Sequence, residues 1–517
     1  MSATLLLELL TEELPPKSLR ALSETFAEQV LAALAKAGLA DGKAPLAVFA
    51  TPRRLAFAIG SVAASAPARE TEVSGPSASA PEQAIAGFAR KHGVDVADLA
   101  RRDTPKGPVL IARVTTKGAL LDERLAAMVD DALKALPIPK LMRWGAGDAQ
   151  FVRPVHGLVM LHGERVVPGQ VLALTSGRTT AGHRFLGERV ITLPRGEDYE
   201  ERLATEGKVI ASFAKRRGEI DRQLKAAAAH EQASLGGYAD LLDEVTALVE
   251  FPQVYAGGFD PAFLEVPAEC LILTMRQNQK YFPLFDPAGK LVPRFLIVSN
   301  MLVPDPRPII AGNERVVRPR LEDARFFYDQ DRKQRLEARV PQLAKVVYHA
   351  KLGSLLDRVQ RLRSLAGRIA ERLAADAALA DRAALLAKAD LLTGMVGEFP
   401  ELQGTMGAYY ARHDNERPEV ANAIGEQYLP RFSGDRLPEH AVSAALALAD
   451  KLEALAGFFS IGQTPTGERD PFGLRRAALG LVRILVEREL ALSLDELLAA
   501  AFTGFARAKA SARQELQ

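Results

Sequence analysis

Apolar positions in the first 150 residues alternate between the spacing of strands and the spacing of helices. Residues 4–10 (TLLLELL) form a short apolar run of the kind that a buried strand shows. Pro15 and Pro16 then open a segment with apolar residues three and four apart, which predicts a helix that ends near Gly38. The expected buried positions of this helix are Leu19, Leu22, Phe26, Val30, Leu31 and Leu34.

The rest of this region continues the mixture. Short β-rich runs predict strands at 47–50, 54–59 and 109–114, and helical spacing predicts helices over 81–91 and 120–136. Residues 62–80 are rich in Ala, Ser and Pro, which is typical of a loop. We therefore expect residues 1–150 to form an N-terminal α/β region.

The pattern changes between residues 151 and 335, where short β-rich runs dominate. Two runs, at 155–161 and 166–174, flank Gly163 and predict a hairpin. Further strands are expected at 190–193, 281–284 and 294–299. A basic, Ala-rich segment at 209–230 predicts a helix.

Beyond about residue 305 the strand signal disappears. Apolar residues at spacings of three and four continue to about residue 506, so 336–500 is expected to be an all-α domain. The fold class is therefore a multidomain α+β protein, with a mixed N-terminal part and a helical part that meet near residues 330–342. At 517 residues the chain is long enough for about three domains.

Composition narrows the class of protein. The sequence is 48% hydrophobic and 25% charged, as soluble globular proteins are. Lys and Arg number 66 and Asp and Glu 64, so the formal charge is only +2. A role in nucleic-acid binding would therefore depend on local clusters of Arg. No apolar stretch is long enough to span a membrane, and the N-terminus lacks the features of a signal peptide, so we expect a cytoplasmic location.

The single cysteine, Cys270, excludes an intrachain disulfide and a CxxC metal site. It lies in the apolar stretch VPAECLILTM with no cationic neighbour, which favours a buried, inert thiol. The sequence also contains no GxxxxGK[ST], no strand followed by GxGxxG, no HExxH and no GxSxG. A self-contained nucleotide-using active site is not supported.

The acidic segment TEELPP at 11–16 has two interpretations. Thr11 would cap the following helix, with Glu12 and Glu13 in the first turn where the helix dipole favours negative charge. Alternatively, the segment is an interface element that meets a partner. In a second capping motif, DPFGLRR at 470–476, Asp470 and Pro471 are expected to start a helix.

Three basic clusters are candidates for contact with RNA. In the first, cations flank the only tryptophan, and in the second a His-Arg pair occupies a turn in TTAGHRFLG. The third lies in the helical segment at 312–332. Arg binds phosphate bidentately and an aromatic ring stacks on unpaired bases, but packing and self-paired helix faces explain the same patterns. The candidates are Arg143, Trp144, Arg153, His183, Arg184, Arg315, Arg318 and Arg320.

A metal site is a further hypothesis. HD-type metal phosphohydrolases use a His, a His-Asp doublet and a later Asp from a helical bundle, and His349, His413-Asp414 and Asp450 occur in that order. However, the apolar run that precedes the doublet in that fold corresponds to 383–392, where Lys388, Ala389 and Asp390 stand instead. A protonated lysine does not bind metal. We therefore expect no metal in this chain.

Several motifs together resemble the β subunit of bacterial two-subunit glycine–tRNA ligase, in that family's order and through most of the chain. They are TEELPP (11–16), APLAVFATPRRLA (44–56), LPIPKLMRWG (136–145), FVRPVHGLV (151–159), GHRFLG (182–187), LVEFP (248–252), NQKYFP (278–283), GNERVVRPRLEDARFFYDQD (312–331), EFPELQGTMG (398–407) and DPFGLRRAALG (470–480).

The resemblance implies a division of labour. The family's α subunit carries the catalytic core and binds ATP, and the β subunit binds tRNA(Gly) and is required for activity. It also implies that 151–335 is similar to modules of the phenylalanine–tRNA ligase β chain. The helical domain would be HD-like, usually without metal chemistry. The partners implied are the α subunit and tRNA(Gly), in an α2β2 heterotetramer, with no membrane.

The chain departs from the family at its end. It finishes with ARAKASARQELQ, where the family's helical anticodon-binding domain is expected to begin. We therefore expect 501–517 to be the start of the segment leading to that domain, and the domain itself to be missing, whether the chain is a fragment or the protein is naturally short. The alternatives to a tRNA-binding β subunit are an HD-type phosphohydrolase and a non-catalytic RNA-binding protein.

Overall fold

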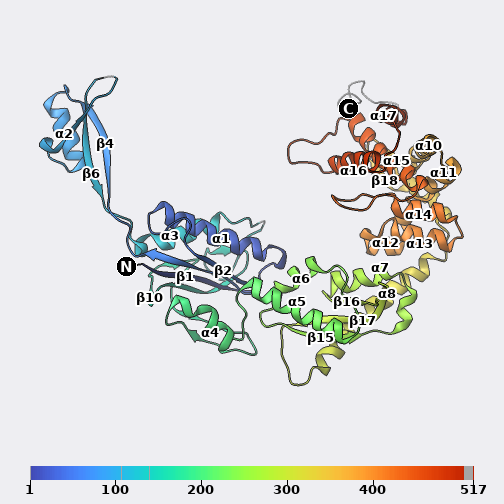
Figure 1. Ribbon diagram of the computed structural model, residues 1–517, viewed down its shortest axis with the longest axis horizontal. Coiled ribbons are helices and arrows are strands. Elements are labelled where there is room, and N and C mark those ends of the chain that lie inside the picture. Colours follow the sequence, from blue (N-terminus) through green and yellow to red (C-terminus); the bar gives the residue numbers. More distant parts are fainter. Residues whose placement is uncertain (1, 106, 139, 506–515, 517) are drawn as a thin grey trace. The chain divides into compact units, whose positions relative to one another are not determined.

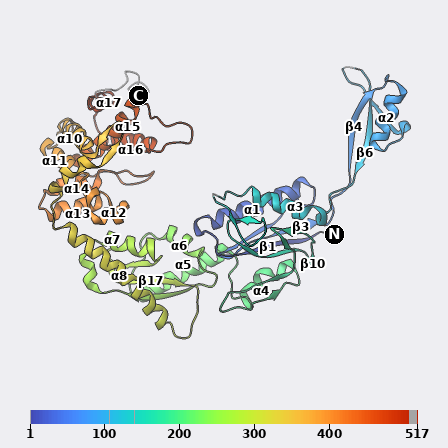
Figure 2. The same ribbon diagram turned by 180° about the vertical axis from the view of Figure 1, so that it is seen from behind.

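The computed structural model describes residues 2–105, 107–138, 140–505 and 516. The chain divides into two compact units (Figure 1; Figure 2). Unit 1 contains 1–257, 280–290 and 295–310, and unit 2 contains 258–279, 291–294 and 311–517. Helices and strands occur together in unit 1 and helices predominate in unit 2, so the expected α+β class is confirmed. Most of the predicted segment 501–517 lies outside the described residues.

Unit 1 is built around a five-stranded antiparallel sheet. Its strands are β1 (Ser2–Thr11), β2 (Leu46–Thr51), β3 (Arg54–Ala63), β9 (Val155–His162) and β10 (Arg165–Val166), in the order β10-β9-β1-β3-β2. The central strand β1 is apolar on both faces because both faces are covered. Leu5, Leu7 and Leu9 pack with helices α1 (Pro16–Lys36) and α3 (Leu121–Lys134), and Leu6 packs with α4 (Tyr199–Thr205) on the opposite face. The same layers are visible in Figure 1.

The segment between β3 and α3 forms a small module with its own sheet, part of which was predicted to be a loop. Three strands, β4 (Arg69–Ser77), β5 (Ala100–Arg102) and β6 (Val109–Thr116), pair in the order β4-β6-β5 and are joined by α2 (Glu82–His92) and η1 (Val96–Asp98). The prediction of a loop over 62–80 is wrong, because β3 continues to Ala63 and β4 occupies much of the remainder. β4 is an edge strand, where polar residues and proline are tolerated, so it lacks the apolar run of a buried strand.

The remaining strands of unit 1 are mostly short. The hairpin at Gly163 is confirmed, but the single strand predicted over 166–174 is replaced by three short segments. A three-stranded sheet in the order β15-β17-β16 lies largely in this unit. The short strands are β7 (Met142–Arg143), β8 (Gln150–Phe151), β11 (Gln170–Val171), β12 (Leu174–Thr175), β13 (Thr179–Thr180) and β14 (Ile191–Thr192), and the three-stranded sheet contains β15 (Gln253–Gly258), β16 (Phe282–Phe285) and β17 (Leu291–Ser299). The remaining helices are η2 (Gly196–Asp198), α5 (Phe213–His230) and α6 (Ala239–Thr246).

Unit 2 is mostly helical among its described residues, apart from the short pair β18–β19 and the first residues of β17. Its most buried helix is α15, in which nearly every side chain is covered by neighbouring helices. The elements are η3 (Pro261–Glu265), α7 (Ala268–Leu273), η4 (Thr274–Asn278), most of α8 (Arg307–Asp331), α9 (Leu336–Arg339), η5 (Val340–Lys345), β18 (Val347–His349), β19 (Gly353–Ser354), α10 (Leu355–Arg372), α11 (Ala377–Leu386), η6 (Ala389–Leu392), α12 (Gly394–Glu398), η7 (Pro400–Leu402), α13 (Thr405–His413), α14 (Pro418–Glu426), α15 (Ala441–Ser460), α16 (Leu474–Glu487) and α17 (Leu494–Phe502).

One predicted helix cap and one predicted helix start differ from the structure. Helix α1 begins at Pro16 without a side-chain cap or an acidic residue in its first turn, and Thr11 is the buried last residue of β1. The capping interpretation of TEELPP is therefore wrong. Helix α16 begins at Leu474 rather than at Pro471, although the Asp470 carboxylate still accepts hydrogen bonds from the backbone N–H of Leu474 and Arg475, at 2.9 Å each.

None of the described helices is both long enough and apolar enough to cross a lipid bilayer.

Candidate functional site

The first basic cluster forms a hairpin between β7 and β8. Arg143 is exposed, and its guanidinium contacts the Asp148 carboxylate at 3.1 Å and donates to the Gly147 carbonyl at 2.8 Å. Trp144 is half-buried and packs against the core of unit 1. Arg153 is also half-buried, with Nη1 donating to the carbonyl of Val152 at 2.8 Å. The ring of Trp144 therefore supports the hairpin, and Arg143 is the member that is open to solvent.

The second cluster surrounds His183, which has only 2% of its surface exposed. Its Nδ1 accepts hydrogen bonds from the backbone N–H of Phe185 at 3.3 Å and Leu186 at 3.2 Å. A neutral imidazole that accepts at Nδ1 carries its proton on Nε2. The buried ring thus shapes the GHRFLG loop from within, and Arg184 and Phe185 are the side chains that the loop exposes.

Three motifs that are distant in sequence meet at Glu12. Its Oε1 lies 2.9 Å from Nε2 of His156, and its Oε2 lies 3.7 Å from the guanidinium of Arg184. The register of the sheet explains the first contact, because Thr11 on β1 pairs with Val155 on β9. TEELPP, FVRPVHGLV and GHRFLG are therefore joined at one place on the surface of unit 1.

The third cluster is divided by the helical repeat of α8. At 3.6 residues per turn, Arg315 and Arg318 lie roughly 60° apart, whereas Arg320 is roughly 150° from both. The buried stripe of Val317 and Leu321 explains the arrangement, since it faces away from Arg315. All three arginines are exposed, and none of them forms an ion pair within the described part of the chain. Arg318 also lines a cavity of about 400 Å³.

In unit 2 the structure brings Lys388 and Asp450 together. Lys388 is completely buried, and its Nζ lies 2.8 Å from Oδ1 of Asp450 and donates to Oε1 of Gln427 at 2.7 Å. Arg358 on α10 binds the same Asp450 oxygen at 2.9 Å and Glu453 at 2.9 Å. Buried charges are retained when they are paired in this way.

Asp390, which stands with Lys388 where the HD fold has its His-Asp doublet, is also completely buried. Its Oδ2 accepts from the backbone N–H of Gly404 at 2.5 Å and of Gly407 at 3.2 Å, and Oδ1 has no partner in the described structure. Burial raises the pKa of Asp390 to about 6, against the opposing effect of these donors and of Lys388. It is therefore held by backbone amides rather than by an ion.

The pKa values of Lys388 and Asp450 follow from their burial and from the charges next to them. Burial lowers the pKa of Lys388 to about 8, although Asp450 opposes the change. Burial acts to raise the pKa of Asp450, but Lys388 and Arg358 outweigh it and lower the pKa to about 2. Both groups are thus charged near pH 7, and the ammonium supplies the positive charge beside Asp450.

The other histidines of the metal hypothesis have different surroundings. The ring of His349 contacts Phe458 and Phe472, with centroids 5.6 and 6.2 Å away. His413 ends α13, and the following Asp414 is buried, with Oδ2 accepting from the backbone N–H of Leu336 at 2.7 Å. Asp414 therefore lies in the interior of unit 2 rather than on its surface. The described residues contain no cluster of three or more His, Cys, Asp or Glu suited to a metal ion.

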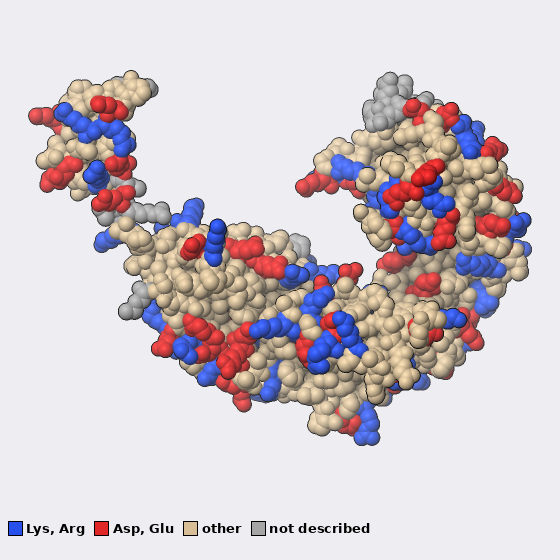
Figure 3. All heavy atoms as spheres, in the orientation of Figure 1, with Lys and Arg blue, Asp and Glu red and all other residues tan. Residues whose placement is uncertain are grey.

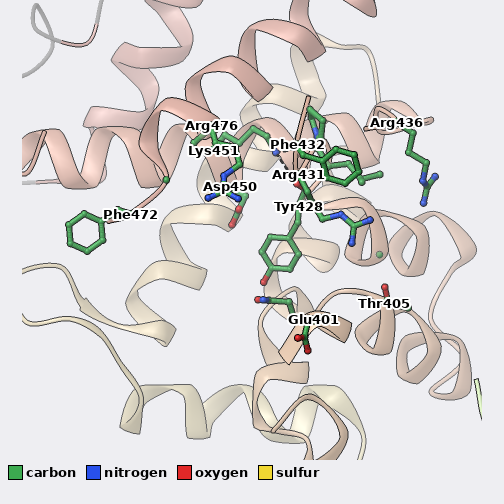
Figure 4. A pocket seen from close by; sticks show the side chains of 16 residues that line it. Glu401, Thr405, Tyr428, Arg431, Phe432, Arg436, Asp450, Lys451, Phe472 and Arg476 are labelled. Carbon is green, nitrogen blue, oxygen red and sulfur yellow. Dashed lines mark hydrogen bonds between the residues drawn. The ribbon is translucent and has the colours of Figure 1, made fainter. Parts of the chain in front are cut away.

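An open cavity of about 800 Å³ lies over this network (Figure 4). Asp450 and Lys451 belong to its lining, together with the aromatic side chains of Tyr428, Phe432 and Phe472. Arg431 and Arg436 line it too, but acidic residues pair with both, Asp435 at 3.3 Å and Glu426 at 3.1 Å. Carboxylates therefore neutralise Arg431 and Arg436, whereas Lys451 and Arg476, which also line the cavity, form no ion pair among the described residues.

Sequence reasoning missed Arg358, Glu453 and Lys451. The signal that would have found the last two is their position in α15, whose other residues are nearly all apolar. A charged residue at a buried helical position needs a buried partner. Cys270 is as predicted: it is buried, its Sγ lies 3.4 Å from Sδ of Met406, and burial raises its pKa to about 12.

Comparison with known proteins identifies the family. The model of the glycyl-tRNA synthetase beta subunit family matches residues 5–517. This chain belongs to that family. The glycine–tRNA ligase beta subunit of Aromatoleum aromaticum is 58% identical over 515 residues, which cover 98% of this chain and 74% of the relative. The corresponding subunit of Neisseria meningitidis serogroup A is 51% identical over 511 residues, with the same coverage.

Family membership agrees with the resemblance that the motifs indicated. A third relative, the glycine–tRNA ligase beta subunit of Cronobacter sakazakii, is 49% identical over 505 residues, which cover 96% of this chain and 72% of the relative. Because these matches extend through both units, the family assignment applies to the α/β part and to the helical part alike.

Proposed function

We propose that this chain acts as the β subunit of a glycine–tRNA ligase, which holds tRNA(Gly) for a separate catalytic α subunit. The observation that carries the proposal is the family match over residues 5–517, with relatives that bear this name. The absence of nucleotide-binding motifs from the sequence supports the same division of labour. ATP and glycine would bind to the α subunit, in a cytoplasmic α2β2 assembly.

The physical role of such a subunit is proximity. Holding the 3′ end of a tRNA next to an aminoacyl-adenylate makes the transfer step effectively unimolecular, which contributes up to about 7–11 kcal/mol. Neither unit needs catalytic side chains for this role. Affinity for tRNA would come from exposed cations that meet phosphates.

Arg315 and Arg318 are the strongest of the proposed tRNA contacts. They share one side of α8 and are exposed, and neither forms an ion pair within the described residues, although Asp260 and Glu314 line the same cavity as Arg318. Arg143 is a weaker candidate because Asp148 contacts its guanidinium. Positive and negative side chains are interspersed on the face that Figure 3 shows, so binding of tRNA there would depend on small clusters of cations.

An aminoacylation assay tests the function. The purified α subunit, tRNA(Gly), ATP and glycine are combined with and without this chain, and glycyl-tRNA is measured. We expect a large gain when the chain is added. If neither this chain nor a longer relative such as the Aromatoleum subunit increases glycyl-tRNA formation, the proposal fails.

A charge-reversal series tests the tRNA contacts. We expect Arg315→Glu and Arg318→Glu to weaken tRNA binding and each to lower the salt slope of the binding constant by roughly one. Arg320→Glu is the matched control, because it makes the same charge change on another side of the same helix. Equal effects of all three substitutions would show a response to net charge rather than a defined contact.

We also propose that the helical domain binds no catalytic metal, because the ammonium of Lys388 already supplies the positive charge beside Asp450 at 2.8 Å. This disfavours the HD-type phosphohydrolase. Metal analysis of the purified chain is the test. A stoichiometric divalent ion that disappears in His349→Ala would contradict the proposal.

A further inference from the structure

Two cations without an ion pair among the described residues line the cavity of about 800 Å³ in unit 2. They are Lys451 on α15 and Arg476 on α16. Lys451 has only 5% of its surface exposed, and its ammonium donates to the carbonyls of Leu429 at 2.7 Å and Tyr428 at 3.5 Å. Burial lowers its pKa to about 8, although Asp450 opposes the change. Buried ammonium groups are rare without a carboxylate partner, and this one has a third N–H to donate.

Close packing fixes both cations at the cavity. A Cβ on Gly480 would lie 2.7 Å from Cε of Lys451, so α16 approaches the lysine chain closely only because a glycine stands there. At the start of the same helix, a Cβ on Gly473 would lie 3.2 Å from Nη2 of Arg476, so the guanidinium lies against this glycine. Figure 4 shows Lys451 and Arg476 on the same side of the cavity. One anion can therefore meet both positive groups.

The other charged side chains around Lys451 and Arg476 are already paired. Carboxylates contact Arg431 and Arg436, and Asp450 is contacted by two cations, Lys388 at 2.8 Å and Arg358 at 2.9 Å. The carboxylate of Asp450 is thus neutralised from the interior of the domain. It leaves the two lining cations without a counter-charge of their own.

Two further carboxylates lie farther along the cavity wall or outside it. Glu401 accepts a hydrogen bond from the side-chain amide of Gln277 at 2.9 Å, and Figure 4 places it on the other side of Tyr428 from Lys451. Asp470 is not part of the lining, and its carboxylate accepts from the backbone N–H groups at the start of α16. The end of the cavity at Lys451 therefore has an excess of positive charge.

Aromatic side chains flank this positive end. Phe472 keeps 42% of its surface exposed while its ring stacks on the buried Phe458, with centroids 4.0 Å and planes 19° apart. Phe432, also in the lining, has 60% of its surface exposed. Nucleic-acid bases stack on aromatic rings of this kind in a manner that tolerates any base. The cavity thus combines a flat apolar surface with a site for an anion.

We propose that the cavity binds a nucleoside monophosphate, with the phosphate at Lys451 and Arg476 and the base on Phe472. A terminal phosphate carries a charge of about −1.5 to −2 at neutral pH, which two unpaired cations match. A polynucleotide, which has a single charge at each phosphate, instead needs a row of free cations. The volume falls within the range of about 300–1,000 Å³ that is usual for small-molecule sites. The site uses side chains rather than a glycine-rich phosphate loop, and it does not depend on the proposed tRNA role.

Calorimetric titration of the chain with AMP, GMP, CMP and UMP tests the proposal. We expect at least one of them to bind about tenfold more tightly than inorganic phosphate and than its own nucleoside, because both halves of the ligand are recognised. Arg476→Met should weaken this binding roughly tenfold, through loss of one charge-assisted contact. Arg475→Met is the matched control, because Arg475 is the adjacent exposed arginine of α16 and does not belong to the lining.

Two more substitutions separate the halves of the site. Phe472→Ala should weaken binding of the nucleotide and leave binding of inorganic phosphate unchanged. Lys451→Met should weaken the binding of both. Thermal unfolding shows whether each variant is folded, and if Lys451→Met is not, the comparison of Arg476→Met with Arg475→Met decides.

Several results would overturn the proposal. One is that none of the four nucleotides binds, and another is that inorganic phosphate binds as tightly as they do, which would reduce the site to an anion site. Equal losses for Arg475→Met and Arg476→Met would show a response to net charge. Tighter binding of a single-stranded RNA with a 5′-hydroxyl end would assign the cavity to RNA. None of these results alters the glycylation assay, so the proposed function stands or falls separately.

Discussion

Each unit contains a buried network of charged residues, and the two networks differ in what surrounds them. In unit 1, Arg54 is completely buried, with Nη1 2.6 Å from Oε1 of Glu250 and Nε 3.5 Å from Oε2 of Glu8. Tyr199 donates to Glu8 at 2.5 Å and Thr51 donates to Glu250 at 2.8 Å. In unit 2, the Lys388–Asp450 pair has an open cavity beside it.

A conspicuous motif is therefore not by itself evidence of a binding site. Arg54 belongs to APLAVFATPRRLA and Glu250 to LVEFP, two of the strings that identified the family. Both residues serve to join β1, β3 and the segment before β15. Lys388, by contrast, belongs to no such string, yet it neutralises Asp450, which lines the cavity of about 800 Å³.

The network of unit 1 should be the more sensitive to loss of its cation. Arg54→Met leaves Glu8 and Glu250 buried without their shared guanidinium, and breaking a buried pair in this way costs about 3–5 kcal/mol. Urea unfolding measures the loss of stability, and hydrogen exchange of the backbone amides of β1 assigns that loss to this unit.

Arg20→Met provides the control for that experiment. Arg20 forms an exposed ion pair with Glu24 on α1 at 2.9 Å, so its removal should cost less than about 1 kcal/mol. Comparable losses for Arg20→Met and Arg54→Met would show that burial of the Arg54 network contributes little.

The raised pKa of Asp390 predicts that the stability of unit 2 depends on pH. Its pKa is raised to about 6 by burial, whereas an unfolded aspartate titrates near 3.9. As the pH rises from 4 to 6, the unfolded state loses its proton first, so this group's contribution to stability falls by up to about 3 kcal/mol. Asp390→Asn should lack that fall. Parallel stability curves for the two proteins between pH 4 and 6 would contradict the prediction.

Lys388→Met should have a smaller effect than Arg54→Met, because Asp450 keeps Arg358 at 2.9 Å. Loss of one charge-assisted set of hydrogen bonds costs about 1.5–3 kcal/mol. A double-mutant cycle with Asp450→Asn measures the coupling between the two side chains. A loss as large as that of Arg54→Met would mean that Arg358 does not compensate and that the two networks are equivalent.

Much of the fold follows from local pattern. The apolar run of β1 and the buried stripe of α1, from Leu19 to Leu34, were predicted because spacing alone identifies a buried face. The errors lie where local signals are weak: β4 at a sheet edge, the short strands between residues 166 and 175, and the start of α16, where Asp470 caps from outside the helix.

The candidate site was less predictable. Its residues were chosen as clusters along the chain, but Arg320 lies on another side of α8 from Arg315, and His183 is buried while Phe185 is exposed. Helical phase and loop conformation decide these orientations. Clustering of charged residues along the sequence indicates neither the helical phase nor the loop conformation.

Apolar periodicity and ordered motifs, which are properties of the chain alone, were enough to predict most of the longer elements, the α+β class and the family. Which charged residues lie inside and which face water depends on the tertiary fold. It paired Lys388 with Asp450 across 62 positions of sequence and brought Glu12, His156 and Arg184 to one place. A charge is stable in the interior only beside a partner, and strand register and helix packing bring such partners together.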